Sequence, residues 1–185
     1  RLYEFDLCFH LAAISQVLDS NKNPIETFDV NLFGTINILE AIRKNKAKTK
    51  IIFSSSDKVY GDNKDLPYTE NTSLNALNPY DASKASADII ARTYAHTFKL
   101  EICVTRFVNI YGPGDYNMDR LVPHVIISTL KNKRSILRSN GKLIRDYLYV
   151  EDVARAYILL MKSMLKKKKL LYIYNVGSNE NLTVI

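Results

Sequence analysis

The sequence predicts an α/β fold, a doubly wound parallel sheet with helices on both faces. Three observations support this prediction. Short apolar runs of strand length recur along the 185 residues, helix-length segments separate them, and apolar residues in the longest segments recur every three or four positions. Strands joined by such helices pair in parallel through βαβ units.

The first half of the chain contains two predicted strands and two predicted helices. Residues 5–13 (FDLCFHLAA) and 50–56 (KIIFSSS) are apolar runs that predict buried strands. Residues 24–45 predict a helix with one apolar face, and residues 79–98 predict a helix that begins at a proline. A polar loop rich in Asp, Asn and Lys covers residues 57–78.

The second half continues with shorter elements. Residues 100–107 predict a third strand, and a turn at residues 111–115 leads to a helix over 121–132. The remaining predicted elements are strands over 135–138 and 144–149 on either side of an Asn140-Gly141 turn, a helix over 150–164 and a strand over 171–176.

Composition and charge exclude several classes of protein. With 46% apolar and 24% charged residues, the chain is not disordered, collagen-like or a coiled coil. It has no run of about 18 uncharged apolar residues, so no membrane helix is predicted. The net charge of +7 comes from scattered lysines with one run at residues 166–169, which is typical of a solvated loop. No nucleic-acid binding is therefore predicted.

The N-terminal residues and the cysteines indicate a cytoplasmic protein. Acidic residues stand at positions 4 and 6, where a secretion signal would be basic and then apolar. Cys8 and Cys103 lie in predicted strands, which favours reduced core thiols, and no metal site is predicted. The chain starts with Arg1, so we expect it to begin inside a longer protein.

Tyr80 and Lys84 form a candidate catalytic pair. They are one helical turn apart and therefore share a face of the predicted helix. An ammonium favours the phenolate of a tyrosine, whose reference pKa is about 10, so the pair can act as a base toward a sugar hydroxyl. The alternative is an exposed helix pair. A second match, Tyr60 and Lys64, falls in a loop and is treated as a chance match.

Three serines, Ser54 to Ser56, end the strand predicted over residues 50–56. Ligands of parallel sheets bind outside the carboxyl ends of the strands, so a serine hydroxyl there is placed to orient the same substrate oxygen. The alternative is a polar strand end that caps the following turn.

The glycines argue against a complete dinucleotide site. None of the six forms the G-x-G-x-x-G turn that lets backbone approach a pyrophosphate. Either no dinucleotide is bound, or the phosphate-binding unit lies upstream of Arg1.

Six motifs occur in one order and at suitable distances. They are FHLAA at 9–13, DVNLFGT at 29–35, FSSSDKVYGD at 53–62, NPYDASK at 78–84, RFVNIYGPGD at 106–115 and IRDYLYVEDVARA at 144–156. Together they resemble the extended short-chain dehydrogenase/reductase family, the nucleotide-sugar epimerases and dehydratases.

The resemblance implies a Rossmann-like sheet, NAD as cofactor and a nucleotide-sugar substrate. It also implies an N-terminally truncated chain. Residues 1–110 would be part of the NAD-binding domain without its first βαβ unit, and residues 111–185 a mixed region with part of a smaller substrate-binding domain and returning Rossmann segments. Such a fragment is expected to be inactive alone. The helices over 25–45 and 79–98 resemble those through which the family forms homodimers.

The resemblance also assigns roles to individual residues. Tyr80 would be the base, Lys84 its partner and a ligand of the nicotinamide ribose, and Ser56 a ligand of the sugar O4. Residues expected beside the cofactor, together with Tyr80 and Lys84, are His10, Leu11, Ala12, Ala13, Asn31 and Ser54. The alternatives are a satisfied core histidine at position 10 and an exposed helix residue at position 31.

Four more residues are expected to bind the substrate. Asn109, Arg120 and Arg145 are similar to positions that hold the diphosphate, and Arg138 is expected near the nucleotide. The planar guanidinium suits phosphate because it makes paired, charge-assisted hydrogen bonds. The alternative for each arginine is an ordinary surface residue.

The dipeptide Asp57-Lys58 resembles that of CDP-glucose 4,6-dehydratases. Oxidation at C4 makes the C5 proton acidic, and loss of water across C5–C6 then needs a base for that proton and an acid for the hydroxyl. Asp57 would be the acid, and Lys58 would assist deprotonation. One alternative for the dipeptide is an ordinary start to a surface loop. A second alternative for the chain is a C4 epimerase or reductase of the same family, which would use Tyr80, Lys84 and Ser56 but not Asp57. Another is a non-catalytic piece that binds nucleotide sugar or a partner protein.

Overall fold

The computed structural model describes residues 1–64, 66–137, 139–166, 172–178, 180 and 182–184. The chain forms two compact units. The first contains Arg1–Phe107 and Tyr157–Val176, and the second contains Val108–Ala156 and Gly177–Ile185. Among the described residues, no helix combines the length and the apolar character needed to cross a membrane.

The first unit is built on a four-stranded parallel sheet in the order β1-β2-β3-β6. Its strands are β1 (Leu7–His10), β2 (Lys50–Ser56), β3 (Ile102–Phe107) and β6 (Ile173–Val176). The parallel α/β fold expected from the sequence is therefore confirmed. The central strands β2 and β3 are buried along almost their whole length, which explains their continuous apolar runs.

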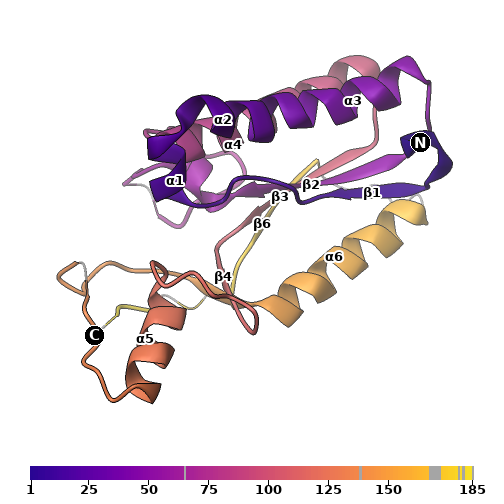
Figure 1. Ribbon diagram of the computed structural model, residues 1–185. Coiled ribbons are helices and arrows are strands. Elements are labelled where there is room, and N and C mark those ends of the chain that lie inside the picture. The colour runs from indigo at the N-terminus through magenta and orange to yellow at the C-terminus, as the bar shows by residue number, and fades with distance from the viewer. Residues whose placement is uncertain (65, 138, 167–171, 179, 181, 185) are drawn as a thin grey trace. The chain divides into compact units, whose positions relative to one another are not determined.

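Helices cover both faces of this sheet (Figure 1). One face carries α1 (Val17–Lys22), α2 (Pro24–Phe28), α3 (Gly34–Lys44) and α4 (Pro79–Phe98), and the other carries α6 (Val150–Leu165). Small side chains let α4 lie close to the sheet, because Ala87, Ala91 and Ala95 pack against Phe53 and Val104 in the largest core cluster. On the opposite face, α6 packs against β1, β2 and β3 from residue 157 onward.

The predicted helix over residues 24–45 is divided. A π-helical segment, η2 (Asp29–Phe33), separates α2 from α3 and buries Asn31. This widened turn brings a polar side chain into the protein interior, which the apolar periodicity of residues 24–45 does not reveal. Helix α1 and the 3-10 turn η3 (Asp57–Tyr60) were not predicted because their short, polar sequences lack a periodic signal.

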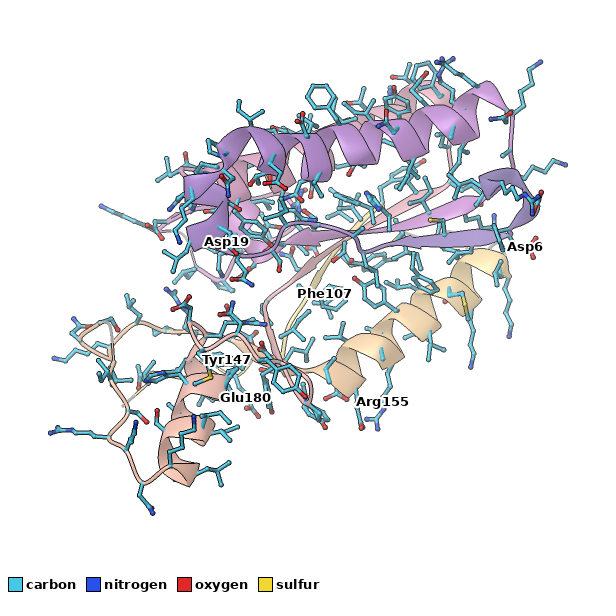
Figure 2. The ribbon with its side chains drawn as sticks, in the orientation of Figure 1. Asp6, Asp19, Phe107, Tyr147, Arg155 and Glu180 are labelled. Atoms are coloured by element: carbon cyan, nitrogen blue, oxygen red, sulfur yellow. The ribbon has the colours of Figure 1, made fainter. Side chains whose placement is uncertain are left out.

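The second unit has a two-stranded parallel sheet and one helix of its own. Strand β4 (Asn109–Tyr111) pairs with β5 (Tyr147–Tyr149), and α5 is Leu121–Leu130. Figure 2 labels Tyr147 and Glu180 in this unit. Strand β5 is therefore shorter than the strand predicted over residues 144–149.

The strand predicted over residues 135–138 was wrong for residues 135–137. The backbone N–H of Ile136 donates to His124 Nε2 of α5 at 3.2 Å, so a side chain takes the place of a partner strand. Arg138, the last residue of that prediction and an expected substrate ligand, lies outside the described residues.

Candidate functional site

Helix α4 places Tyr80 and Lys84 in its first two turns. The helix begins at Asn78, whose Oδ1 accepts the backbone N–H of Asp81 at 3.0 Å, and Pro79 follows in the first turn. Tyr80 is half-buried and Lys84 is buried. The pair is therefore not the exposed helix pair of the alternative interpretation.

Lys84 points at the second strand of the sheet. Its ammonium donates to the backbone carbonyl of Ser54 and lies 4.9 Å from the centre of the Phe53 ring. Burial lowers the pKa of Lys84 to about 8, and the carboxylate of Asp88 works in the opposite direction. The structure thus brings a charged group of α4 to the carboxyl end of β2, where the serines stand.

Ser56 and the two residues after it form a compact polar turn. Ser56 Oγ accepts the backbone N–H of Lys58 and bonds Asp57 Oδ1, each at 3.2 Å. Asp57 Oδ2 pairs with Lys58 Nζ at 2.8 Å, and both side chains remain partly exposed. The capping expected under the alternative interpretation is therefore present. The same turn places the Asp57 carboxyl, the Lys58 ammonium and the Ser56 hydroxyl together at the end of β2.

Asn31 joins three segments of the first unit. Its amide exchanges two hydrogen bonds with the backbone of Ile14, at 2.8 and 3.0 Å, and donates to Ser83 Oγ at 2.8 Å. The side chain is only 2% exposed, so the exposed-residue alternative was wrong. Asn31 holds the backbone beyond β1 against the start of α4.

His10 is a satisfied interior histidine, as its alternative interpretation predicted. The hydroxyl of Thr35 donates to the Asn31 carbonyl at 2.7 Å, so its oxygen is left to accept a hydrogen bond from His10 Nε2 at 2.9 Å. The residues after it face outward, because Leu11 is 52% exposed and Ala12 is exposed. An apolar, accessible stretch thus follows β1, while His10 stays inside.

We expect His10 to make the protein less stable in mild acid. Burial and the nearby Lys84 ammonium lower the pKa of His10 to about 4, from an ordinary value of 6.5. Between pH 6.5 and pH 4 the unfolded chain takes up a proton at His10 and the folded protein does not. The free energy of unfolding is therefore highest above pH 6.5 and falls as the pH approaches 4, by at most about 3 kcal/mol.

His10→Gln should remove this pH dependence while keeping an amide that can bond Thr35. Urea unfolding of both proteins at pH 7 and pH 5 measures the effect. The wild type should lose more stability than the variant on acidification. Equal losses in the two proteins would show that His10 does not contribute.

Asp81 was missed in the sequence. It is 6% exposed, and one carboxylate oxygen, Oδ2, accepts from the Asn78 amide. Among the described residues, its Oδ1 has no hydrogen-bond partner. Burial raises the pKa of Asp81, whereas the hydrogen bond from Asn78 and the nearby Lys58 ammonium act to lower it. The Asn-x-x-Asp spacing signals a helix cap, but not this buried position beside the polar turn.

The second unit contains a cavity of about 210 Å³ that brings two predicted arginines together. Arg120 and Arg145 both line it, with His124 and Tyr147, which were not predicted. The guanidinium of Arg120 pairs with Asp115 at 2.9 Å, which fixes its direction. Asp119 and Ser139 also line the cavity, and the remaining lining side chains are apolar, so it combines two cations with an apolar surface suited to a flat ring.

Asn109 does not line this cavity. Its Nδ2 donates to the Asp146 carbonyl at 3.2 Å and so ties β4 to the chain before β5. Close packing supports the same region, because a Cβ on Gly177 would come within 2.3 Å of Asp146 Oδ2. In this structure Asn109 therefore supports the backbone of the second unit.

Comparisons with known proteins agree on one family. A family model described as the NAD dependent epimerase/dehydratase family matches residues 2–177. The dTDP-D-glucose 4,6-dehydratase of Dictyostelium discoideum is 36% identical over 187 residues, which cover 95% of this chain and 42% of that protein. The chain spans about half the length of the curated relatives it matches.

Solved structures give the same picture. The dTDP-glucose 4,6-dehydratase of Bacillus anthracis, solved with NAD, has a TM-score of 0.83 and 34% identity, covering 98% of this chain and 54% of that one. The UDP-glucose 4-epimerase of Thermotoga maritima, solved with UDP-glucose, has a TM-score of 0.88 and 31% identity, covering 98% and 58%. These dehydratases are named for dTDP-glucose, whereas the dipeptide Asp57-Lys58 pointed to CDP-glucose.

Proposed function

Because the chain belongs to the NAD-dependent epimerase/dehydratase family, we propose that the protein carrying it is a 4,6-dehydratase of a nucleotide hexose. The observation that carries this choice within the family is the Asp57–Lys58 pair, joined at 2.8 Å directly after Ser56. Such a pair offers an acid and a base beside the hydroxyl-bearing end of β2, which a simple 4-epimerisation does not require.

The first half of the proposed reaction uses groups of β2 and α4. Tyr80 removes the proton of the sugar 4-hydroxyl, and Ser56 hydrogen-bonds the same oxygen. The Lys84 ammonium favours the phenolate of Tyr80 one helical turn away. NAD held beside Lys84 and Ser54 would supply the chemistry of hydride removal at C4 and of hydride return at C6.

The second half uses the turn after Ser56. A ketone at C4 makes the C5 proton acidic. The elimination uses the neutral form of the pair, in which the proton shared between Lys58 Nζ and Asp57 Oδ2 lies on the carboxyl and the Lys58 amine takes the C5 proton. Asp57 delivers its proton to the leaving 6-hydroxyl, so the C6–O bond breaks, water departs and a C5–C6 double bond forms. Ser56 Oγ and Lys58 Nζ both contact the Asp57 carboxyl and would hold it in place for this transfer.

The residues of the first unit fit one end of NAD. The accessible stretch Leu11–Ala13 after β1, with Ser54 and the Lys84 ammonium, would hold the nicotinamide ribose. Asn31 would keep the stretch in place through Ile14. None of the six glycines forms the pyrophosphate-binding turn, so these 185 residues would supply only part of the cofactor site.

The substrate's nucleotide diphosphate suits the chemistry of the second unit. Arg120 and Arg145 would neutralise the phosphates, and the apolar wall of the cavity would hold the base. The names of the similar dehydratases favour dTDP-hexose over the CDP-hexose suggested by Asp57-Lys58.

A C4 epimerase of the same family is the second candidate. Similarity to UDP-glucose 4-epimerases favours it, and such an enzyme would use Tyr80, Lys84 and Ser56 without Asp57. A third candidate is a non-catalytic piece that binds a nucleotide sugar or a partner protein. Failure of the complete gene product to bind NAD would favour this candidate.

Mass spectrometry separates the candidates. The complete gene product is incubated with NAD and dTDP-, UDP- and CDP-hexoses, and the products are weighed. We expect the loss of one water, and expect Asp57→Asn to slow it roughly 10²-fold because the acid is removed. Asp62→Asn, a change at an exposed carboxyl of the same loop, is the control and should be close to wild type. A 4-epimer of unchanged mass would contradict the dehydratase assignment.

We also propose a homodimer through the helices predicted over 25–45 and 79–98. Large apolar side chains on these segments remain exposed. They include Ile25 at 74%, Phe33 at 53% and Ile89 at 47%. A soluble protein gains stability by covering such a surface. Analytical ultracentrifugation of the complete gene product would show whether a dimer forms.

A further inference from the structure

Arg106 is a charged side chain in the middle of the first unit. It lies on β3, is 1% exposed, and donates four charge-assisted hydrogen bonds, three to side chains and one, at 3.4 Å, to the backbone carbonyl of Glu70. Its Nε and Nη2 donate to the two carboxylate oxygens of Asp88, at 2.9 and 2.8 Å. Its Nη1 donates to the phenolic oxygen of Tyr60 at 2.7 Å. The guanidinium therefore reaches two different elements at once.

The two hydrogen bonds to Asp88, here called the Asp88 arm, connect Arg106 to the helix that carries Tyr80 and Lys84. Asp88 lies one helical turn beyond Lys84 and is wholly buried. It also accepts the hydroxyl of Ser55 at 2.8 Å. Ser55 stands between Ser54, whose carbonyl receives Lys84, and Ser56. This arm therefore joins α4 to the end of β2.

The hydrogen bond to Tyr60, here called the Tyr60 arm, connects Arg106 to the turn that carries Asp57 and Lys58. Tyr60 is the last residue of η3, is 1% exposed, and donates its own proton to Asn175 Oδ1 of β6 at 2.6 Å. Asn175 in turn donates its backbone N–H to Glu70 and its side-chain amide to the Tyr68 carbonyl. The far end of the acid-bearing turn is thus held by one buried hydrogen bond, from Arg106, and by partly buried ones through Asn175.

We propose that Arg106 is a positioning residue that fixes the Asp57–Lys58 turn in position relative to α4, the helix of Tyr80 and Lys84. In this proposal the hydrogen bond from Arg106 to Tyr60 holds the turn. This inference rests on the proposed dehydratase function. The two arms use different guanidinium nitrogens, so they can be tested separately. Removing only the Tyr60 hydroxyl leaves both bonds from Arg106 to Asp88.

Tyr60→Phe tests the Tyr60 arm in the complete gene product. In a single turnover with NAD and the active nucleotide hexose, absorbance at 340 nm follows C4 oxidation and mass spectrometry follows water loss. We expect oxidation within about twofold of wild type and water loss at least tenfold slower, because only the acid-bearing turn is loosened. Reduced cofactor should then accumulate. A merely structural defect would slow both steps equally.

Hydrogen exchange provides a readout that needs no substrate. The backbone N–H of Lys58 bonds Ser56, and that of Gly61 bonds the Lys58 carbonyl. In Tyr60→Phe both should exchange at least tenfold faster, whereas the amides of α4 should keep their wild-type rates. Tyr94→Phe, which removes a phenol bonded to Glu40 on α3, is the matched control and should change neither readout.

Arg106→Lys is the second variant if Tyr60→Phe does not fold. A lysine ammonium should pair with the buried carboxylate of Asp88 and then cannot also reach Tyr60, so the same accumulation of reduced cofactor is expected. The inference would be overturned if the variant slowed C4 oxidation and water loss equally and left hydrogen exchange at the amides of residues 58 and 61 unchanged. That result would not affect the dehydratase assignment. A wild-type protein that removes no water would overturn the assignment, and the exchange rates alone would then decide the positioning role.

Discussion

Tyr80→Phe should lower the rate of C4 oxidation by roughly 10³–10⁴-fold, because it removes the proposed base and leaves Lys84 with no phenolate to stabilise. Binding of nucleotide sugar should change little, since only one hydroxyl is lost. Stopped-flow absorbance at 340 nm with the complete gene product measures the step, and calorimetry measures binding.

Tyr116→Phe is the matched control for this experiment. Tyr116 is 88% exposed, and the same atom is removed, so its activity should equal that of the wild type. A Tyr80→Phe protein that keeps more than a tenth of wild-type activity would show that another group removes the proton. The assignment of Tyr80 as base would then be wrong, although the fold and the family would be unaffected.

Arg106→Met should destabilise the protein by about 3–5 kcal/mol, because it leaves the buried carboxylate of Asp88 without its main partner. Arg92 also bonds Asp88, at 2.8 Å, but its side chain is 35% exposed and compensates only in part. The hydroxyl of Tyr60 loses its donor as well. Urea unfolding followed by circular dichroism measures the change.

The control for this prediction is Arg155→Met. Arg155 pairs with Asp152 and Glu151 on α6, but its side chain is 74% exposed, and solvent screens such pairs (Figure 2). Its loss should change the unfolding free energy by less than about 1 kcal/mol. Similar effects of the two substitutions would mean that the interior pair contributes no more than a surface pair.

Some elements could be predicted from the sequence with their bounds. Strand β2 covers the predicted residues 50–56, and α4 covers 79–98. In both cases the signal is local, because a buried strand requires a continuous apolar run and Asn78-Pro79 marks a helix start. Short elements such as α1, η3 and β4 lack enough residues for a periodic pattern, so they were missed.

In the candidate site, too, features with a local signal could be predicted and features that depend on distant partners could not. The residue types after β2 and at the start of α4 indicated acid–base chemistry on a sugar, and the order of six motifs indicated the family. Asp81 was missed, because its burial depends on what packs over it. The roles of Asn31 and Arg106 likewise depend on partners 17 to 52 residues away in the chain.

The sequence by itself determined the parallel α/β architecture, the family and the residues available for chemistry. These features follow from composition, periodicity and motif order, which are local properties of the chain. Only the tertiary structure decided which polar groups are interior and which partners they have. Lys84 meets the end of β2, and Arg106 joins α4 to the turn after Ser56, because folding removes these groups from water and each must then find a partner on a neighbouring element.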